Sequence, residues 1–240
     1  AKRPPPGKCV HCLRENLPRN WDHVFPKAWY PDSTPPNLQK WQIPSCESCN
    51  SEYGELENDL LLVLSCCVDP HIAETSGLYQ KALRSINPEL AKNDRDRSAR
   101  AARAKWLKDN MVQGVDIPES KIYPDLGERW GRPIEQAQGM KIPFNNLSRL
   151  TEKIVRGIYF LEFSGTFIEP PYQITFYDPT IARSSSIVDL IEQSGKEYAR
   201  ESIIVVRQVF SENDPMYAAF EISIWNQFKM YATVTKHASA

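Results

Sequence analysis

Residues 9–12 read Cys9-Val10-His11-Cys12, residues 22–26 read Asp22-His23-Val24-Phe25-Pro26, and residues 46–50 read Cys46-Glu47-Ser48-Cys49-Asn50. The first and third motifs are Cys-x-x-Cys pairs, whose short spacing lets both thiolates reach one metal ion. Four thiolates form a closed tetrahedral zinc site with Zn–S distances of about 2.3 Å. We therefore predict a structural Zn²⁺ with four ligands: Cys9, Cys12, Cys46 and Cys49.

The zinc ion would also bring together polar residues that lie far apart in the sequence. It would hold the segment that contains Asp22 and His23 near Asn50, which directly follows the last cysteine. Because four protein ligands leave no open coordination position, the zinc itself would do no chemistry. Any chemistry would come from the residues that it brings together.

These motifs together resemble the HNH nuclease family, also called the ββα-metal finger, over roughly residues 7–68. In that family a hairpin and a helix hold one divalent metal. One branch also has two Cys-x-x-Cys pairs, with the metal-binding Asn directly after the last Cys. The resemblance implies that His23 activates water as general base, and that Asp22 and Asn50 hold one Mg²⁺ or Mn²⁺.

The family also has a middle Asn that braces the loop of the catalytic His through backbone hydrogen bonds. The nearest candidate here is Asn37, although the interval to Cys46 is longer than usual and Trp41 lies nearer the usual place. We assign the brace to Asn37.

Two local expectations concern the first motifs. Adjacent side chains of a regular strand point to opposite faces, so Asp22 and His23 can face one phosphate only if their strand begins irregularly. We expect that irregularity. We expect His11 to be exposed, because it is redundant as a fifth zinc ligand.

The composition bounds the class of protein. The chain has 240 residues, 41% of them hydrophobic, and a formal net charge of −1, so it can bury a sizeable core, and nucleic acid would have to bind to local basic patches. No apolar run approaches the roughly 20 residues that span a bilayer. No secretory signal is visible, and four of the six cysteines lie in the pairs. We expect a cytoplasmic protein without membrane contact.

The hydrophobic pattern predicts an α+β fold in three parts. Residues 1–70 form the nuclease-like domain, with strands near 22–25 and 40–43 and a helix from about 50 to 69. Residues 71–146 form a helical and irregular connection, with helices near 79–83 and 88–111. Residues 147–240 form a C-terminal α+β domain that begins with a helix and continues as an antiparallel sheet. We predict strands near 172–177, 203–210, 220–224 and 228–234, a helix over 187–193 and a turn at Asn226-Gln227.

Two basic helix faces are candidates for phosphate contact, with a solvated surface as the alternative in each case. The first consists of Arg97, Arg100 and Arg103, and the second of Arg149, Lys153 and Arg156.

The predicted function is therefore metal-dependent hydrolysis of DNA by an HNH endonuclease, in a setting such as restriction or antiphage defence, with RNA not excluded as substrate. One active block per chain would nick one strand, so a double-strand cut needs a homodimer or two visits. The main alternative is a zinc-stapled module that binds nucleic acid without cutting it. In a third reading the C-terminal domain, whose chemistry is not indicated, is a recognition, dimerisation or sensor part.

Overall fold

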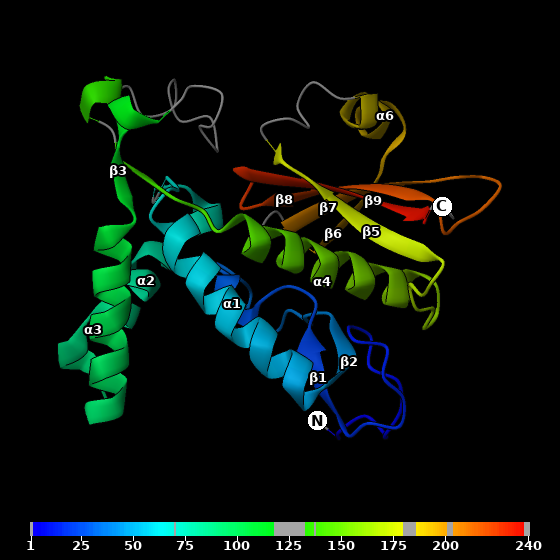
Figure 1. Cartoon of the computed structure of the whole chain (residues 1–240), viewed down its shortest axis with the longest axis horizontal. Coiled ribbons are helices and arrows are strands. Elements are labelled where there is room, and N and C mark those ends of the chain that lie inside the picture. Colours follow the sequence, from blue (N-terminus) through cyan, green and yellow to red (C-terminus); the bar gives the residue numbers. More distant parts are fainter. Residues whose placement is uncertain are drawn as a thin grey trace.

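The computed structural model of the chain describes residues 2–69, 71–117, 133–136, 138–179, 186–200 and 204–237. Within these ranges the fold is mixed α+β, as predicted, with five α-helices and a C-terminal antiparallel sheet of five strands. Figure 1 shows helix α4 between that sheet and the N-terminal elements.

The N-terminal part consists of a two-stranded antiparallel sheet and a helix. Strand β1 (Arg19–His23) pairs with β2 (Gln42–Cys46), and α1 (Glu47–Ser65) follows β2 directly. A short helical turn, Lys27–Trp29, lies in the connection between the strands. The helix was predicted to begin near Asn50. It begins at Glu47, so that Cys49 and Asn50 lie in its first turn.

The middle part contains α2 (Leu78–Ile86), α3 (Asp94–Asp109) and the paired strands β3 (Met111–Gln113) and β4 (Gln138–Met140). The prediction of one continuous helix over 88–111 is wrong. A separate turn, Pro88–Leu90, ends first, and the Asn93 side chain then accepts a hydrogen bond from the Asp96 amide at the start of α3. This N-cap explains the break, because it satisfies an amide that a new helix leaves free.

The C-terminal sheet has the strand order β5-β9-β8-β7-β6, with every neighbouring pair antiparallel. Its strands are β5 (Tyr172–Tyr177), β6 (Lys196–Arg200), β7 (Ile204–Phe210), β8 (Ala218–Ile224) and β9 (Phe228–Lys236). The predicted strands are confirmed, and β6 is an additional one. The turn before β9 centres on Trp225 and Asn226, both with positive φ, one residue earlier than predicted.

Each face of the sheet is covered by one helix. Helix α4 (Phe144–Glu162) packs on the face formed by alternate apolar residues such as Val206, Phe220 and Met230. Helix α6 (Ser186–Ser194) packs on the other face against Ala219 and Tyr231. The predicted helix over 187–193 is confirmed, and its backbone ends at Gly195, whose amide donates to the Ile191 carbonyl over 2.8 Å.

Helix α4 also contacts the N-terminal part very closely. A Cβ atom built on Gly157 would lie 2.8 Å from Cγ2 of Val24, the residue after β1. Trp225, at the end of β8, donates its indole N–H to the Trp29 carbonyl over 2.9 Å. A single apolar core cluster runs from Val10 to Val234 through all three predicted parts. The division of the chain at residues 70 and 146 stays a prediction.

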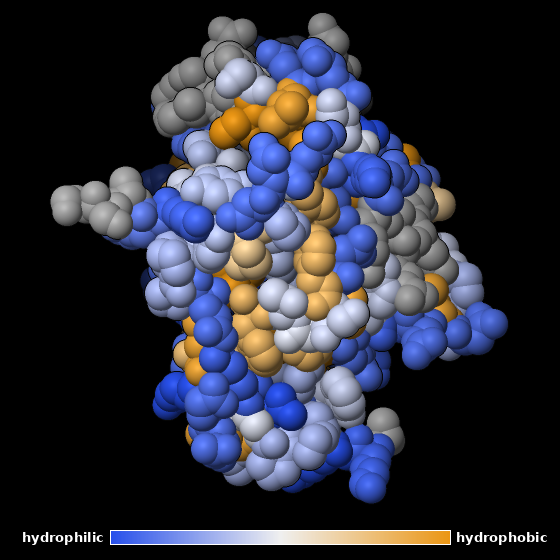
Figure 2. Space-filling model, turned by 90° about the vertical axis from the view of Figure 1, so that its right-hand side faces the viewer, coloured by the Kyte–Doolittle hydropathy of each residue, from blue (hydrophilic) through white to orange (hydrophobic). Residues whose placement is uncertain are grey.

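The surface is mixed in character. On the face shown in Figure 2, hydrophobic side chains gather in the middle and near one end, with hydrophilic ones around them. No helix in the described ranges is both long and apolar enough to cross a membrane.

Candidate metal centre and active site

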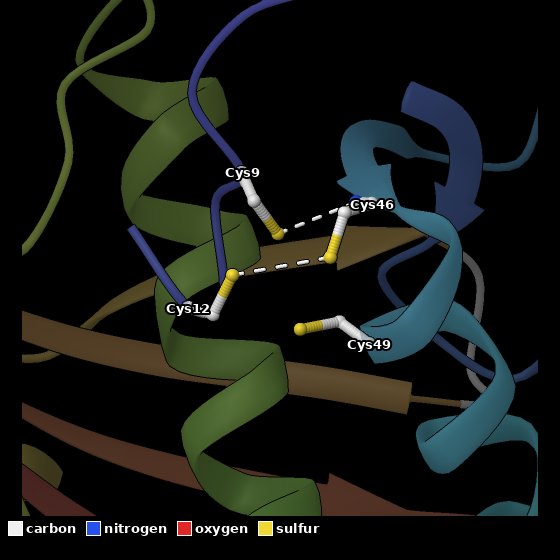
Figure 3. Close-up of side chains that lie close together, drawn as sticks. All are labelled: Cys9, Cys12, Cys46 and Cys49. Atoms are coloured by element: carbon white, nitrogen blue, oxygen red, sulfur yellow. Dashed lines mark hydrogen bonds between the residues drawn. The ribbon is translucent and has the colours of Figure 1, made fainter. Parts of the chain in front are cut away.

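The four predicted zinc ligands lie together. The Sγ atoms of Cys9, Cys12, Cys46 and Cys49 all lie within 4.8 Å of one another, and Figure 3 shows the four side chains pointing toward a common centre. The sulfurs of a tetrahedral site with Zn–S bonds of about 2.3 Å would be about 3.8 Å apart. The Cys12 and Cys46 sulfurs are 3.9 Å apart, so this cluster can bind a metal ion such as zinc.

The local backbone explains how the first pair reaches the second. Leu13 has a positive φ of 61°, and its amide donates to the Cys9 carbonyl over 3.0 Å, which closes the turn around the first pair. The amide of Cys46 donates to the Cys9 sulfur over 3.3 Å. All six cysteines are free thiols.

Neighbouring groups affect the thiols unequally. Burial acts to raise the pKa of Cys12, but hydrogen bonds from Arg14 outweigh it and lower the pKa to about 6. Burial raises the pKa of Cys49. Metal binding requires thiolates, so it would release protons from this cluster.

Strand β1 places Asp22 and His23 on opposite faces. Asp22 pairs with Ile43 and His23 with Gln42, in regular antiparallel register. Asp22 is only 5% exposed, whereas His23 is half-buried. The predicted irregular start of this strand is therefore not present.

Asp22 belongs to a buried polar cluster that joins three elements. Its Oδ2 lies 3.0 Å from Nε2 of His11, and its Oδ1 accepts a hydrogen bond from Lys153 of α4 over 2.9 Å. Lys153 also donates to Glu57 of α1. His11 is only 7% exposed and Lys153 is 0% exposed. We call Asp22, His11, Lys153 and Glu57 the lysine cluster.

The prediction that His11 is exposed is wrong. Its ring packs 4.7 Å from the ring of Tyr53, and burial lowers its pKa despite the nearby Asp22 carboxylate. A neutral His11 donates from Nε2 to Asp22, which leaves its buried Nδ1 without a partner in the described structure. His11 therefore orients Asp22 rather than binding the predicted zinc.

Two carboxylates of the lysine cluster differ in charge state. Burial acts to raise the pKa of Asp22, but the hydrogen bond from His11 and the charge of Lys153 lower it overall. Burial raises the pKa of Glu57 to about 7, even though Lys153 acts in the opposite direction. Asp22 is thus firmly ionised at neutral pH, while Glu57 titrates near it.

His23 is available as a neutral base. Burial lowers its pKa, with the charges of Lys27, Lys153 and Lys40 acting in the same direction against that of Asp22. Its Nε2 lies 3.1 Å from the amide nitrogen of Gln42. Because that amide nitrogen can only donate, Nε2 of His23 is the acceptor.

The two predicted asparagines are less closely connected. Asn50 is half-buried in the first turn of α1, and Asn37 is exposed in the turn before Leu38. Within the described ranges, no side-chain hydrogen bond joins either residue to Asp22 or His23. The metal-binding role of Asn50 and the bracing role of Asn37 stay predictions.

The predicted basic faces are largely paired with protein acceptors. On α3, Arg97 binds Asp94 over 2.8 Å and Arg100 binds Asp96 over 3.0 Å. Burial raises the pKa of Asp59, and the positive charge of Arg103 acts in the opposite direction. The Arg97 side chain is exposed and remains accessible to a partner, whereas the Arg100 side chain is only 17% exposed and also donates to the Arg84 carbonyl.

The second predicted basic face, on α4, is not a continuous exposed surface, because one of its three residues is buried. Arg149 binds Glu52 over 3.0 Å, and Arg156 binds Glu152 over 2.9 Å and the Ile168 carbonyl over 2.8 Å. Lys153 points inward to the lysine cluster and is therefore not part of any exposed phosphate face.

The sequence analysis missed the roles of His11, Glu57 and Lys153. One signal for Lys153 was present, because it lies three residues after Leu150 and four before Gly157, on the inward side of α4. A charged residue on an inward face requires a buried partner. Nothing in the sequence, however, indicated that the partner is Asp22, 131 residues away.

Comparison of the chain with protein-family models, with curated proteins and with solved structures gave no match.

Proposed function

We propose that this protein is a metal-dependent HNH-type endonuclease that hydrolyses phosphodiester bonds in DNA. The observation that carries the proposal is the order of the elements around the cysteine cluster. Strand β1 ends with Asp22-His23, β2 leads through Cys46 into α1, and Asn50 lies in the first turn of α1. This order of two strands and a helix supports the finer prediction of a ββα-metal fold.

The donor types at Asp22 and Asn50 match the cofactor that the resemblance implies. Because β1 turns Asp22 and His23 to opposite faces, the proposal requires this strand to rearrange when metal and phosphate bind. Mg²⁺ and Mn²⁺ prefer oxygen ligands, and Asp22 and Asn50 offer a carboxylate and an amide oxygen. Asp22 is held ionised, which a cation ligand requires. When bound, the metal would polarise a phosphoryl oxygen and stabilise the leaving 3′ oxygen. Zn²⁺ at the four cysteines would be structural.

His23 supplies the base in this proposal. Its lowered pKa keeps the imidazole neutral at physiological pH, the state in which it can take a proton from water. Nε2 already acts as an acceptor toward Gln42, so a water molecule that replaces the Gln42 amide would give its proton to the same nitrogen. Attack by the resulting hydroxide would leave a 5′-phosphate product.

A second candidate function is nucleic-acid binding without cleavage. The observation that favours it is that both oxygens of Asp22 already have protein partners. Oδ2 contacts His11, and Oδ1 accepts a hydrogen bond from Lys153. A binding module would need only the cysteine cluster and accessible arginines of α3 such as Arg97.

The experiment is cleavage of supercoiled plasmid DNA in Mg²⁺ or Mn²⁺ by the wild-type protein, His23→Ala and His71→Ala. His71 is an exposed histidine outside the site, so it controls for general loss of a histidine. We expect the wild-type protein and His71→Ala to nick the plasmid, and His23→Ala to be inactive with the same zinc content. Binding of DNA by a wild-type protein that never cuts would favour the second function, and equal cleavage by His23→Ala would refute the base.

A further inference from the structure

The Lys153 ammonium has a complete set of partners, and one of them is Asp22. It donates to Oδ1 of Asp22 over 2.9 Å and to Glu57, and it lies 5.4 Å from the centre of the Tyr53 ring. The ammonium group of Lys153 therefore has three partners: two carboxylates and one aromatic ring. The side chain is fully buried, so this arrangement is part of the packed structure.

The position of Lys153 is fixed by the packing of α4. Gly157, one turn further along the helix, lies so close to Val24 that a Cβ atom would contact both methyl groups of that side chain at less than 3.0 Å. This close approach of α4 to the end of β1 brings the lysine to Asp22. A helix of the C-terminal part thus places a cation at a carboxylate of the N-terminal part.

We propose that Lys153 occupies the cation position at Asp22 and competes there with the divalent metal ion. The inference rests on the proposed function, because it takes Asp22 to be a metal ligand. A metal ion bound to Oδ1 of Asp22 would meet the Lys153 ammonium, which lies 2.9 Å from that oxygen. Metal binding at Asp22 therefore requires the ammonium to move away.

Glu57 provides a place for the displaced ammonium. When Lys153 leaves Asp22, it keeps Glu57 and Tyr53 as partners, so no charge is left unpaired in the interior. Movement of Lys153 toward Glu57 would open Asp22, and movement back would close it.

The test measures binding of Mn²⁺ to the full chain by electron paramagnetic resonance of the free ion. The variants are Lys153→Met, which keeps the side-chain volume without the charge, and Arg156→Met as a control on the same helix. Two cations coupled at one carboxylate should affect each other by about 5- to 150-fold. We expect Lys153→Met to bind Mn²⁺ tighter by a factor in this range and Arg156→Met to bind as the wild type does. Unchanged or weaker binding by folded, zinc-loaded Lys153→Met would overturn the proposal.

Glu57→Gln gives an independent comparison and also covers the case that Lys153→Met does not fold. It should weaken Mn²⁺ binding in the wild-type background, because Lys153 then has only Asp22 as a charged partner. In the double variant Glu57→Gln with Lys153→Met, residue 57 is an uncharged amide and no ammonium faces Asp22. Binding of Mn²⁺ should again be tighter than in Glu57→Gln alone. Weaker or equal binding in that pair overturns the inference.

Asp22→Asn separates this inference from the proposed function. Loss of Mn²⁺ binding in Asp22→Asn with no effect of Lys153→Met would refute the competition alone. Unchanged Mn²⁺ binding in Asp22→Asn would refute the ligand set of the proposed function, and the competition with it.

Discussion

The N-terminal part of the molecule and the C-terminal sheet are ordered by different means. The sheet has four antiparallel strand pairs, and alternate apolar residues such as Phe220 and Met230 fill its core. The N-terminal part has one pair of five-residue strands with a long connection. Four cysteines and the lysine cluster join segments of this part that lie far apart in the sequence.

This difference indicates where single substitutions matter. The sheet is held by backbone pairing and by apolar packing on the face that α4 covers. The N-terminal part shares that apolar core but also depends on a few polar groups that join distant segments. Changes at those groups should therefore have larger effects than comparable surface changes in the sheet, and changes at the cysteines should also affect metal binding by the cysteine cluster.

The largest effect is expected for Cys49→Ser. Metal binding at structural zinc sites contributes on the order of 10 kcal/mol to the folding of zinc-finger peptides, so loss of one ligand should release zinc and unfold the region around β1 and β2. Zinc content and hydrogen exchange of the N-terminal amides measure this loss. Cys66→Ser, outside the cluster, serves as the control and should keep its zinc. Retention of zinc by Cys49→Ser would contradict the account.

Gly157→Ala should destabilise the contact between α4 and the N-terminal part. The added methyl would lie 2.8 Å from Val24 Cγ2, and overpacking of this kind costs about 1–3 kcal/mol. Gly54→Ala in α1 is the matched control, because nothing lies within 4 Å of its added Cβ and alanine favours a helix over glycine by about 1 kcal/mol. Urea unfolding should show opposite signs for the two variants. Equal stabilisation in both would mean that α4 does not pack closely on Val24.

The lysine cluster should make stability depend on pH through Glu57. The folded-state pKa of Glu57 is about 7, above its ordinary 4.5, so its contribution is fully present below about pH 4.5 and is lost as pH rises to about 7. His11 and His23 act in the opposite direction, because their pKa values are lowered. The difference in the free energy of unfolding between wild type and Glu57→Gln isolates Glu57. It should shift in favour of Glu57→Gln as pH rises from 5 to 8, and a flat difference would contradict the raised pKa.

The smallest effect is expected for Asn226→Gly in the sheet. Asn226 has a φ of 54° in the turn between β8 and β9, a conformation that glycine adopts without strain. We expect stabilisation by at most about 1 kcal/mol, seen as a slightly higher melting temperature. A clear decrease would show that the Asn226 side chain has a role in the turn.

The sequence predicted the sheet well because its signals are local. The two-residue alternation in β5, β8 and β9 and the glycine after α6 depend only on neighbouring residues. The cysteine cluster was also predictable, because thiols in two close pairs have few other uses in a chain without disulfides.

The environment of Asp22 could not be predicted in the same way. The lysine that holds it is 131 residues away and reaches it only because α4 packs between the sheet and the N-terminal part. The predictions that His11 is exposed and that the strand at Asp22 begins irregularly were wrong for a related reason. Both expectations considered the motif alone, whereas contacts with α1 and α4 determine which face of β1 is buried.

The central claim, that His23 is the base of a phosphodiester hydrolase, is tested most directly by chemical rescue. His23→Ala would be assayed on plasmid DNA in Mn²⁺ with increasing concentrations of free imidazole. The account predicts that imidazole restores cleavage to His23→Ala but does not accelerate the wild-type protein or an inactive Asp22→Asn variant. Cleavage by His23→Ala without imidazole, or an inactive variant that no imidazole concentration rescues beside an active wild type, would contradict the assignment of His23 as the base.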